Sequence, residues 1–191
     1  MVGGVVARLM AIRRPDLKRV VAYSSVAHMS LCVAAAATGT VVGILGAFLL
    51  GVAHGLSSRG LFAWVGGVRE RVGTRTTLAI AGLRRYGMFH LVIFVLLFMF
   101  SRGIPPFFSF PPEILIWARL WTQNGVLVVG LLAAGGVVGL VLFLLIFLKG
   151  LVGDLQEARQ PQSIRLVSVF FVHLVLGVWL YIFPSSLTRW A

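Results

Sequence analysis

Long apolar segments alternate with short polar junctions along this chain. A helix of about 20 apolar residues crosses a bilayer core of about 30 Å. The segments of that length are Val20–Thr38, Val41–Gly67, Gly87–Leu120, Gly125–Leu148 and Ile164–Phe183. Another segment, Val2–Ile12, is too short to cross at about 1.5 Å per residue. The pattern predicts an all-α polytopic membrane protein with five full transmembrane helices and a short N-terminal helix, forming a single membrane domain over residues 1–191.

The third apolar segment contains two proline pairs, Pro105–Pro106 and Pro111–Pro112. Proline has no backbone N–H and its ring clashes with the preceding helical turn. We therefore expect the third full span to be broken at these pairs. Broken backbone at membrane depth is tolerated where it is buried in protein or lines a wet cavity, and broken helices accompany ion sites in transporters.

The composition agrees with a membrane location, because 59% of the 191 residues are hydrophobic and only 12% are charged. This polar surface is too small to coat a water-soluble globule, which excludes an ordinary cytosolic enzyme. Cys32 is the only cysteine, so an intrachain disulfide or a cysteine metal site cannot form. The sequence has no phosphate-binding glycine loop and no Cys/His metal spacing. We expect no cofactor and no metal in this chain.

The net charge of +12 is concentrated in three polar junctions. In a soluble protein this excess would suggest nucleic acid, but in a membrane chain it orients the helices, so we expect no nucleic-acid partner. With alternating helices, the three junctions fall on one face, which is the cytoplasmic or matrix face, and the C-terminus falls on the other. Their basic residues are Arg13, Arg14, Lys18, Arg19, Arg69, Arg71, Arg75, Arg84, Arg85, Lys149, Arg159 and Arg165.

Glycines recur at spacings that allow helices to approach closely in lipid. They are Gly39, Gly43 and Gly46, then Gly51 with Gly55, and Gly135 with Gly139. Plain tolerance of glycine in membrane helices explains the same pattern, so both interpretations stay open.

Few ionisable side chains fall at membrane depth, where a charge is costly and suggests function. His28 and His54 lie near the middle of the first and second full spans. They are candidates for a proton relay, because histidine titrates near neutral pH, and packing within an apolar helix is the alternative. Glu113 is the only carboxylate inside an apolar stretch. It is a candidate for loading and releasing a proton, the alternative being a glutamate that reaches the membrane surface.

Two arginines are candidates for tuning such a carboxylate. Arg59 lies one turn beyond His54 and is either a counter-charge or a residue that reaches toward a partner chain. Arg102 sits at the predicted break and is a candidate partner for Glu113. Of the other histidines, we expect His90 to be interfacial and His173 to pack within the last span.

Three blocks of this sequence resemble the antiporter-like membrane subunits of respiratory complex I, in particular chain 4 of NADH:ubiquinone oxidoreductase. The first is Asp-Leu-Lys-Arg-Val-Val-Ala-Tyr-Ser-Ser-Val-Ala-His-Met at residues 16–29. The second is His-Gly-Leu-Ser-Ser-Arg-Gly-Leu-Phe at residues 54–62, followed by the charged loop 68–75. The third is Gly-Ile-Pro-Pro at residues 103–106, followed by Glu113. The likeness covers about residues 1 to 120 by motif and the rest by hydropathy.

The resemblance implies proton translocation in the membrane arm of complex I, with the redox chemistry in other subunits. His28 and His54 match central members of a row of ionisable residues in the family, and Glu113 matches the terminal carboxylate near the exit. The resemblance also implies a multi-pass location in the mitochondrial inner membrane, in contact with lipid and other membrane-arm subunits. The basic junctions would then face the matrix and the C-terminus the intermembrane space.

The sequence also departs from the family pattern. Arg59 stands where a small residue is usual, and Pro112 replaces a glycine before the glutamate. The uptake half of the channel is absent, so we expect the C-terminal half of a split subunit that docks onto a separate chain carrying the N-terminal half. The alternatives are a subunit of a related Mrp-type cation/proton antiporter and a non-pumping structural scaffold.

Overall fold

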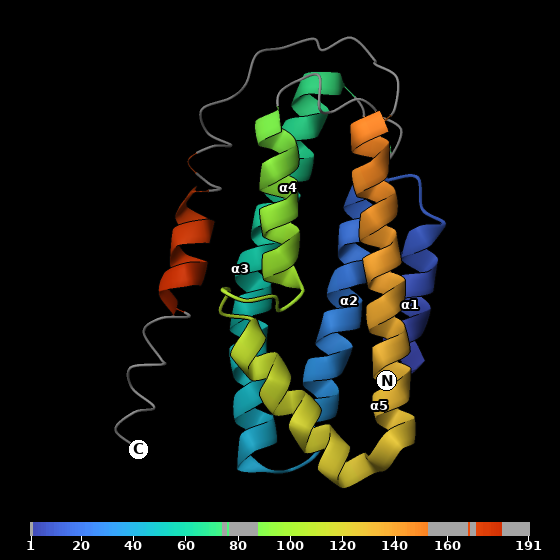
Figure 1. Cartoon of the computed structure of the whole chain (residues 1–191), viewed down its shortest axis with the longest axis vertical. Coiled ribbons are helices and arrows are strands. Elements are labelled where there is room, and N and C mark those ends of the chain that lie inside the picture. Colours follow the sequence, from blue (N-terminus) through green and yellow to red (C-terminus); the bar gives the residue numbers. More distant parts are fainter. Residues whose placement is uncertain (1, 74–75, 77–87, 153–167, 169–170, 181–191) are drawn as a thin grey trace.

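The computed structural model describes residues 2–73, 76, 88–152, 168 and 171–180, and this part of the chain is all-helical (Figure 1). The helices are α1 (Val2–Ile12), α2 (Leu17–Ala36), α3 (Val41–Val72), α4 (Met88–Ser101), α5 (Phe110–Val152) and a last helix, Phe171–Leu180. The predicted short N-terminal helix is confirmed at its predicted bounds. The predicted fifth span, Ile164–Phe183, is described only at residue 168 and over Phe171–Leu180.

Figure 1 shows the helices running up and down the long axis of the molecule. The α1–α2 turn, the end of α3, the start of α4 and the end of α5 lie at one end of the molecule. The α2–α3 turn and the bend in α5 lie at the other end. The described residues of the three basic junctions therefore share one end, as predicted from alternating helices. Arg75, Arg84, Arg85, Arg159 and Arg165 lie outside the described residues.

The polar junctions end the helices through specific caps. Asp16 begins α2, where its side chain accepts a hydrogen bond from the Lys18 backbone N–H at 2.8 Å. Thr40 caps α3 in the same way, accepting from the Gly43 backbone N–H at 3.2 Å. Such caps satisfy backbone donors that have no partner within the helix. Gly73 ends α3 with a φ of 79°, which glycine adopts without steric cost.

The third predicted span is broken, but only one proline pair lies in the break. α4 ends at Ser101 and α5 begins at Phe110, with Pro105–Pro106 between them. The expectation that Pro111–Pro112 also interrupts the helix is wrong, because both prolines lie in the first turn of α5. Proline is tolerated in a first turn, where the backbone N–H groups would have no helical partner.

α5 is one helical run with two arms. It bends at Gly125, whose φ of 69° and ψ of −169° are not helical. The first arm continues the broken third span and the second arm matches the predicted fourth span. Within the described residues, two helical stretches are long and apolar enough to cross a bilayer by themselves, Leu17–Ala36 and Val41–Glu70. The other apolar helices of that part are shorter.

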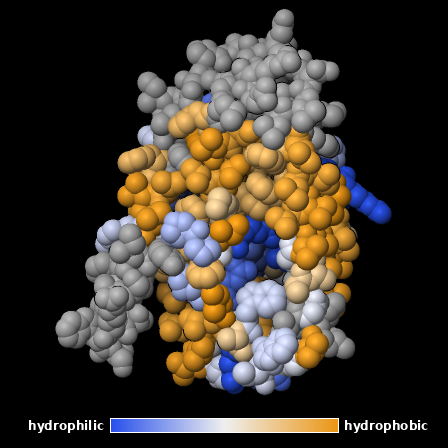
Figure 2. Space-filling model, in the orientation of Figure 1, coloured by the Kyte–Doolittle hydropathy of each residue, from blue (hydrophilic) through white to orange (hydrophobic). Residues whose placement is uncertain are grey.

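Much of the apolar surface stays outside the core. Trp64 lies in the core between α3 and α4, where the centroid of its ring is 4.6 Å from that of Phe94. Its indole N–H donates a hydrogen bond to the His90 backbone carbonyl at 3.0 Å. By contrast, Val41 is 82% exposed and Phe48 is 68% exposed. Figure 2 shows the resulting orange surface. Contiguous exposed apolar surface marks contact with lipid or with another protein, which agrees with a polytopic membrane protein.

Candidate functional site

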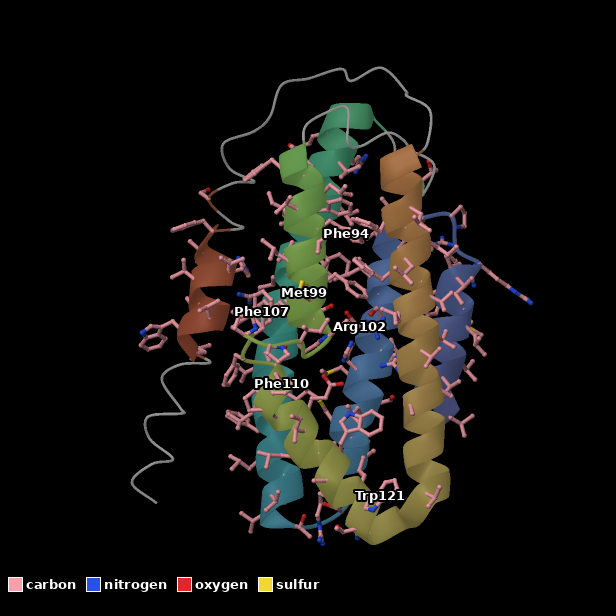
Figure 3. The ribbon with its side chains drawn as sticks, in the orientation of Figure 1. Phe94, Met99, Arg102, Phe107, Phe110 and Trp121 are labelled. Carbon is pink, nitrogen blue, oxygen red and sulfur yellow. The ribbon has the colours of Figure 1, made fainter. Side chains whose placement is uncertain are left out.

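A cavity of about 200 Å³ lies between α1, α2, the α4–α5 break and α5. Its polar and charged lining residues are Arg8, Ser30, Arg102, Glu113 and Trp117. Figure 2 shows a hollow in the middle of the drawn face with hydrophilic residues at its base and hydrophobic residues around it. Figure 3 places Arg102 at that level, about halfway along the bundle. A charged cavity at this depth is the strongest candidate site in the described part of the chain.

Glu113 reaches the cavity from the first turn of α5, directly after the break. Its Oε2 atom is buried and has no hydrogen-bond partner in the described structure. Gly103 makes room for it, because a Cβ at that position would collide with the Glu113 carboxylate. The φ of Gly103 is 61°, so the glycine also permits the turn that brings the break back toward the carboxylate.

Arg102 follows α4 directly and lines the cavity. Its guanidinium stands 4.9 Å from the centre of the Phe98 ring, a cation–π contact. A Cβ added to Gly139, in the second arm of α5, would overlap the guanidinium. Arg102 also lines a second cavity of about 40 Å³, which includes Ser24 and Ser101. The arginine therefore stands between two internal spaces of the bundle.

Arg8 is a site residue that the sequence analysis missed. It comes from α1, lines the cavity and contacts the backbone of Gly135, where an added Cβ would collide with its guanidinium. The available signal was an arginine inside the short apolar segment Val2–Ile12. Both arginines lie close enough to interact electrostatically with Glu113. None of the described contacts pairs the carboxylate directly with either arginine.

The two candidate relay histidines are stacked. The rings of His28 in α2 and His54 in α3 lie 5.4 Å apart between centroids, with an angle of 27° between their planes. His28 is only 2% exposed, and neither of its ring nitrogens has a hydrogen-bond partner in the described structure. It is flanked in sequence by Ala27, which lines the cavity, and it lies within electrostatic reach of Arg102. The fold therefore brings the histidine pair close to the cavity.

Other predicted residues lie elsewhere. Arg59 is exposed on α3 and is not among the residues that line the cavity. His90 is buried at the start of α4, edge-on to Phe89. His173 is half-buried in the last helix. Within the described residues there is no group of three His, Cys, Asp or Glu side chains that could hold a metal ion.

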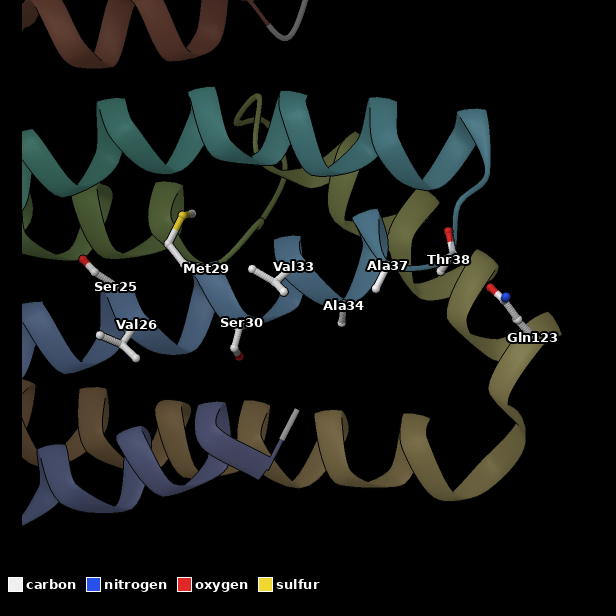
Figure 4. A pocket seen from close by; sticks show the side chains of 9 residues that line it. All are labelled: Ser25, Val26, Met29, Ser30, Val33, Ala34, Ala37, Thr38 and Gln123. Atoms are coloured by element: carbon white, nitrogen blue, oxygen red, sulfur yellow. The ribbon is translucent and has the colours of Figure 1, made fainter.

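A larger groove of about 780 Å³ runs along one face of α2 toward Gln123 (Figure 4). None of its described lining residues is ionisable. Ser30 lines both the groove and the charged cavity, and it donates a hydrogen bond to the Ala27 carbonyl at 2.7 Å. Size alone therefore does not identify the chemical site, because the polar groups converge on the smaller cavity.

Comparison with known proteins agrees with this arrangement. The family described as NADH:quinone oxidoreductase/Mrp antiporter, TM matches residues 1–146. NADH-ubiquinone oxidoreductase chain 4 of the sea urchin Strongylocentrotus purpuratus is 39% identical over 118 residues, covering 62% of this chain and 26% of the relative. The same-named chain of the snake Agkistrodon piscivorus piscivorus is 34% identical over 131 residues, covering 68% of this chain and 57% of the relative.

The fold is also that of a chain in respiratory complex I from Thermus thermophilus. In the structure with bound NADH the TM-score is 0.88 at 21% identity, covering 98% of this chain and 40% of that chain. In the structure with bound aureothin the TM-score is 0.76 at 22% identity, covering 96% and 42%. This chain thus spans between about a quarter and somewhat over half of the curated relatives cited above. It belongs to the transmembrane family shared by NADH:quinone oxidoreductases and Mrp antiporters.

Proposed function

We propose that this chain forms the exit half of a proton-translocating channel in the membrane arm of respiratory complex I. The observation that carries the proposal is the Glu113 carboxylate in a charged cavity halfway along the bundle, where its Oε2 atom has no hydrogen-bond partner and the described contacts include no direct ion pair with an arginine. A carboxylate held near cations without a direct ion pair can change its protonation state without breaking a salt bridge. The similarity to chain 4 of NADH-ubiquinone oxidoreductases favours this assignment within the family.

Each residue of the cluster has a distinct role in the proposal. Glu113 takes up and releases the proton. His28 and His54 relay it by way of their ring nitrogens. Waters complete the path between the two rings, because ring stacking itself transfers no proton. Arg102 and Arg8 lower the cost of the Glu113 negative charge by their positive charges. The electron transfer takes place in other subunits, and this chain holds no cofactor.

The proposal includes the arrangement in the membrane. α2 and α3 are two spans, α4 with the first arm of α5 is a broken third, the second arm of α5 is a fourth, and Phe171–Leu180 is the described part of a fifth. The basic end faces the matrix of a mitochondrion and the C-terminus faces the intermembrane space. The chain contacts lipid and other membrane-arm subunits, one of which carries the uptake half of the channel.

The test is proton pumping by the assembled complex carrying Glu113→Gln. The amide cannot ionise but nearly matches the carboxylate in shape, so we expect normal assembly and quinone reduction with fewer protons moved per electron pair. Glu70→Gln is the matched control, because Glu70 is exposed at the end of α3. An unchanged proton stoichiometry in the assembled Glu113→Gln complex would defeat the proposal and favour a structural scaffold.

The family description itself favours one alternative, a subunit of an Mrp-type cation/proton antiporter. Both assignments use the same membrane helices, but only complex I reduces quinone. Purifying the native assembly and measuring NADH-dependent quinone reduction separates them. An assembly that exchanges cations for protons without reducing quinone would support the antiporter.

A further inference from the structure

The charges of the central cavity do not balance. Arg8 and Arg102 contribute two positive charges, since arginine stays protonated in proteins. Glu113 is the only carboxylate among the described residues that line the cavity. An uncompensated charge inside a membrane domain is strongly unfavourable. The cavity therefore needs one further negative charge when Glu113 is ionised, and two when Glu113 is protonated.

The cavity also offers unused hydrogen-bond donors. The Nε atoms of Arg8 and Arg102 are buried and have no hydrogen-bond partner in the described structure. Guanidinium groups prefer anionic acceptors, because hydrogen bonds between charged groups are about twice as strong as neutral ones. Gly135 and Gly139 leave room for the two guanidiniums beside the second arm of α5, because a Cβ at either position would collide with one of them.

Size and depth restrict what the second negative charge can be. A cavity of about 200 Å³ holds a small ion and a few waters, since one water occupies about 30 Å³ of liquid. Lipid phosphates lie outside a hydrocarbon core of about 30 Å, whereas Arg102 lies halfway along the bundle. A lipid headgroup is therefore a poor fit, and a small anion that enters with water is a good one.

We propose that this cavity binds a small monovalent inorganic anion such as chloride between Arg8 and Arg102, opposite Glu113. While Glu113 is ionised, its charge would balance one of the two arginines and the anion would balance the other. Binding would strengthen when Glu113 is neutral, because the positive charge of the cavity is then larger. The inference depends only on the charges and contacts of the cavity, so it stands or falls separately from proton translocation.

The experiment uses the full chain in lipid nanodiscs and bromide as the probe. Bromide quenches tryptophan fluorescence, and Trp117 lines the cavity. Sodium bromide replaces sodium gluconate at constant ionic strength, and gluconate is too bulky to fit beside the side chains. We expect a saturable quenching component that chloride relieves by competition and that Trp117→Phe removes. The exposed Trp121 is expected to add quenching that rises linearly with bromide. The Trp117→Phe variant measures this linear part, which is then subtracted.

Arg8→Gln should weaken bromide binding at least about tenfold, because it removes one of the two cations, whereas Arg119→Gln should leave it unchanged. Arg119 lies outside the cavity and donates to the Thr40 hydroxyl at 3.1 Å. If Arg8→Gln loses helical content, Gly135→Ala is used instead, because a Cβ at Gly135 would collide with the Arg8 guanidinium. Gly130→Ala is its control, because nothing lies within 4 Å of a Cβ at Gly130.

Two kinds of result would overturn the proposal. One is quenching that rises linearly with bromide, or saturable quenching that is the same in the parent chain and the Arg8 or Gly135 variant. The other is a structure of the assembled complex in which a carboxylate from a neighbouring subunit lies between the two arginines. Neither result would bear on the Glu113→Gln pumping test, so the two proposals fail independently.

Discussion

Gly139→Ala is expected to destabilise the fold, although alanine is the better helix former. The added methyl group would overlap the Arg102 guanidinium, which must then leave its place 4.9 Å from the Phe98 ring centre. Overpacking of this kind costs about 1–3 kcal/mol, and loss of the cation–π contact about 0.5–2 kcal/mol. The gain in helix propensity offsets about 1 kcal/mol. The free energy of unfolding should therefore fall by roughly 0.5–4 kcal/mol.

The assay is equilibrium unfolding of the full chain by sodium dodecyl sulfate, followed by far-ultraviolet circular dichroism. Gly130→Ala is the matched control on the same arm of α5, because a Cβ there meets nothing within 4 Å. It should be as stable as the parent chain or up to about 1 kcal/mol more stable. If Gly139→Ala proves as stable as Gly130→Ala, then Arg102 is not held against Gly139, and the description of the cavity wall is wrong.

Three further substitutions test the fold. Asp16→Ala should lower the free energy of unfolding by about 1 kcal/mol, because the Lys18 backbone N–H loses its cap, and Asp16→Asn should largely restore it in the same unfolding assay. Gly46→Ala should cost about 1–3 kcal/mol through overlap with Cγ1 of Ile116, and a double-mutant cycle with Ile116→Ala, which removes that atom, should show a non-additive recovery, whereas purely additive losses would contradict the contact. Trp64→Phe should cost about 1–3 kcal/mol, because the backbone carbonyl at the start of α4 loses its indole donor; an unchanged unfolding midpoint would argue against that hydrogen bond.

The helices were predictable because apolar length and polar caps are local properties of the chain. The segment Val2–Ile12 forms α1 at its predicted bounds, and the polar residues Asp16 and Thr40 begin the two helices that follow. The break was predictable from Pro105–Pro106. The residue at which the break ends was not predictable, because a proline pair is compatible with both a break and a first helical turn. The structure shows that α5 begins at Phe110, which places Pro111–Pro112 in its first turn.

The glycine pattern was only partly informative. Gly46 does allow close approach, because a Cβ there would press on Ile116 of α5. Gly51 and Gly55 have nothing within 4 Å of an added Cβ in the described structure, so among the described residues this pair fits the second interpretation, plain tolerance of glycine. Gly135 and Gly139 face arginine side chains instead of a helix backbone. Spacing predicts a small-residue stripe, but it does not reveal what lies opposite.

The sequence by itself determined the apolar spans, the basic end of the bundle and the choice of Glu113, His28 and His54. Each follows from the free energy of placing apolar or charged groups at a given depth, which depends on residue type and position along a helix. Only the tertiary structure decided which cations surround Glu113. It brought Arg8 and Arg102 to the cavity and left Arg59 exposed, because helix packing sets which faces meet, and in the case of Arg8 and Gly135 those faces are more than a hundred residues apart in the sequence.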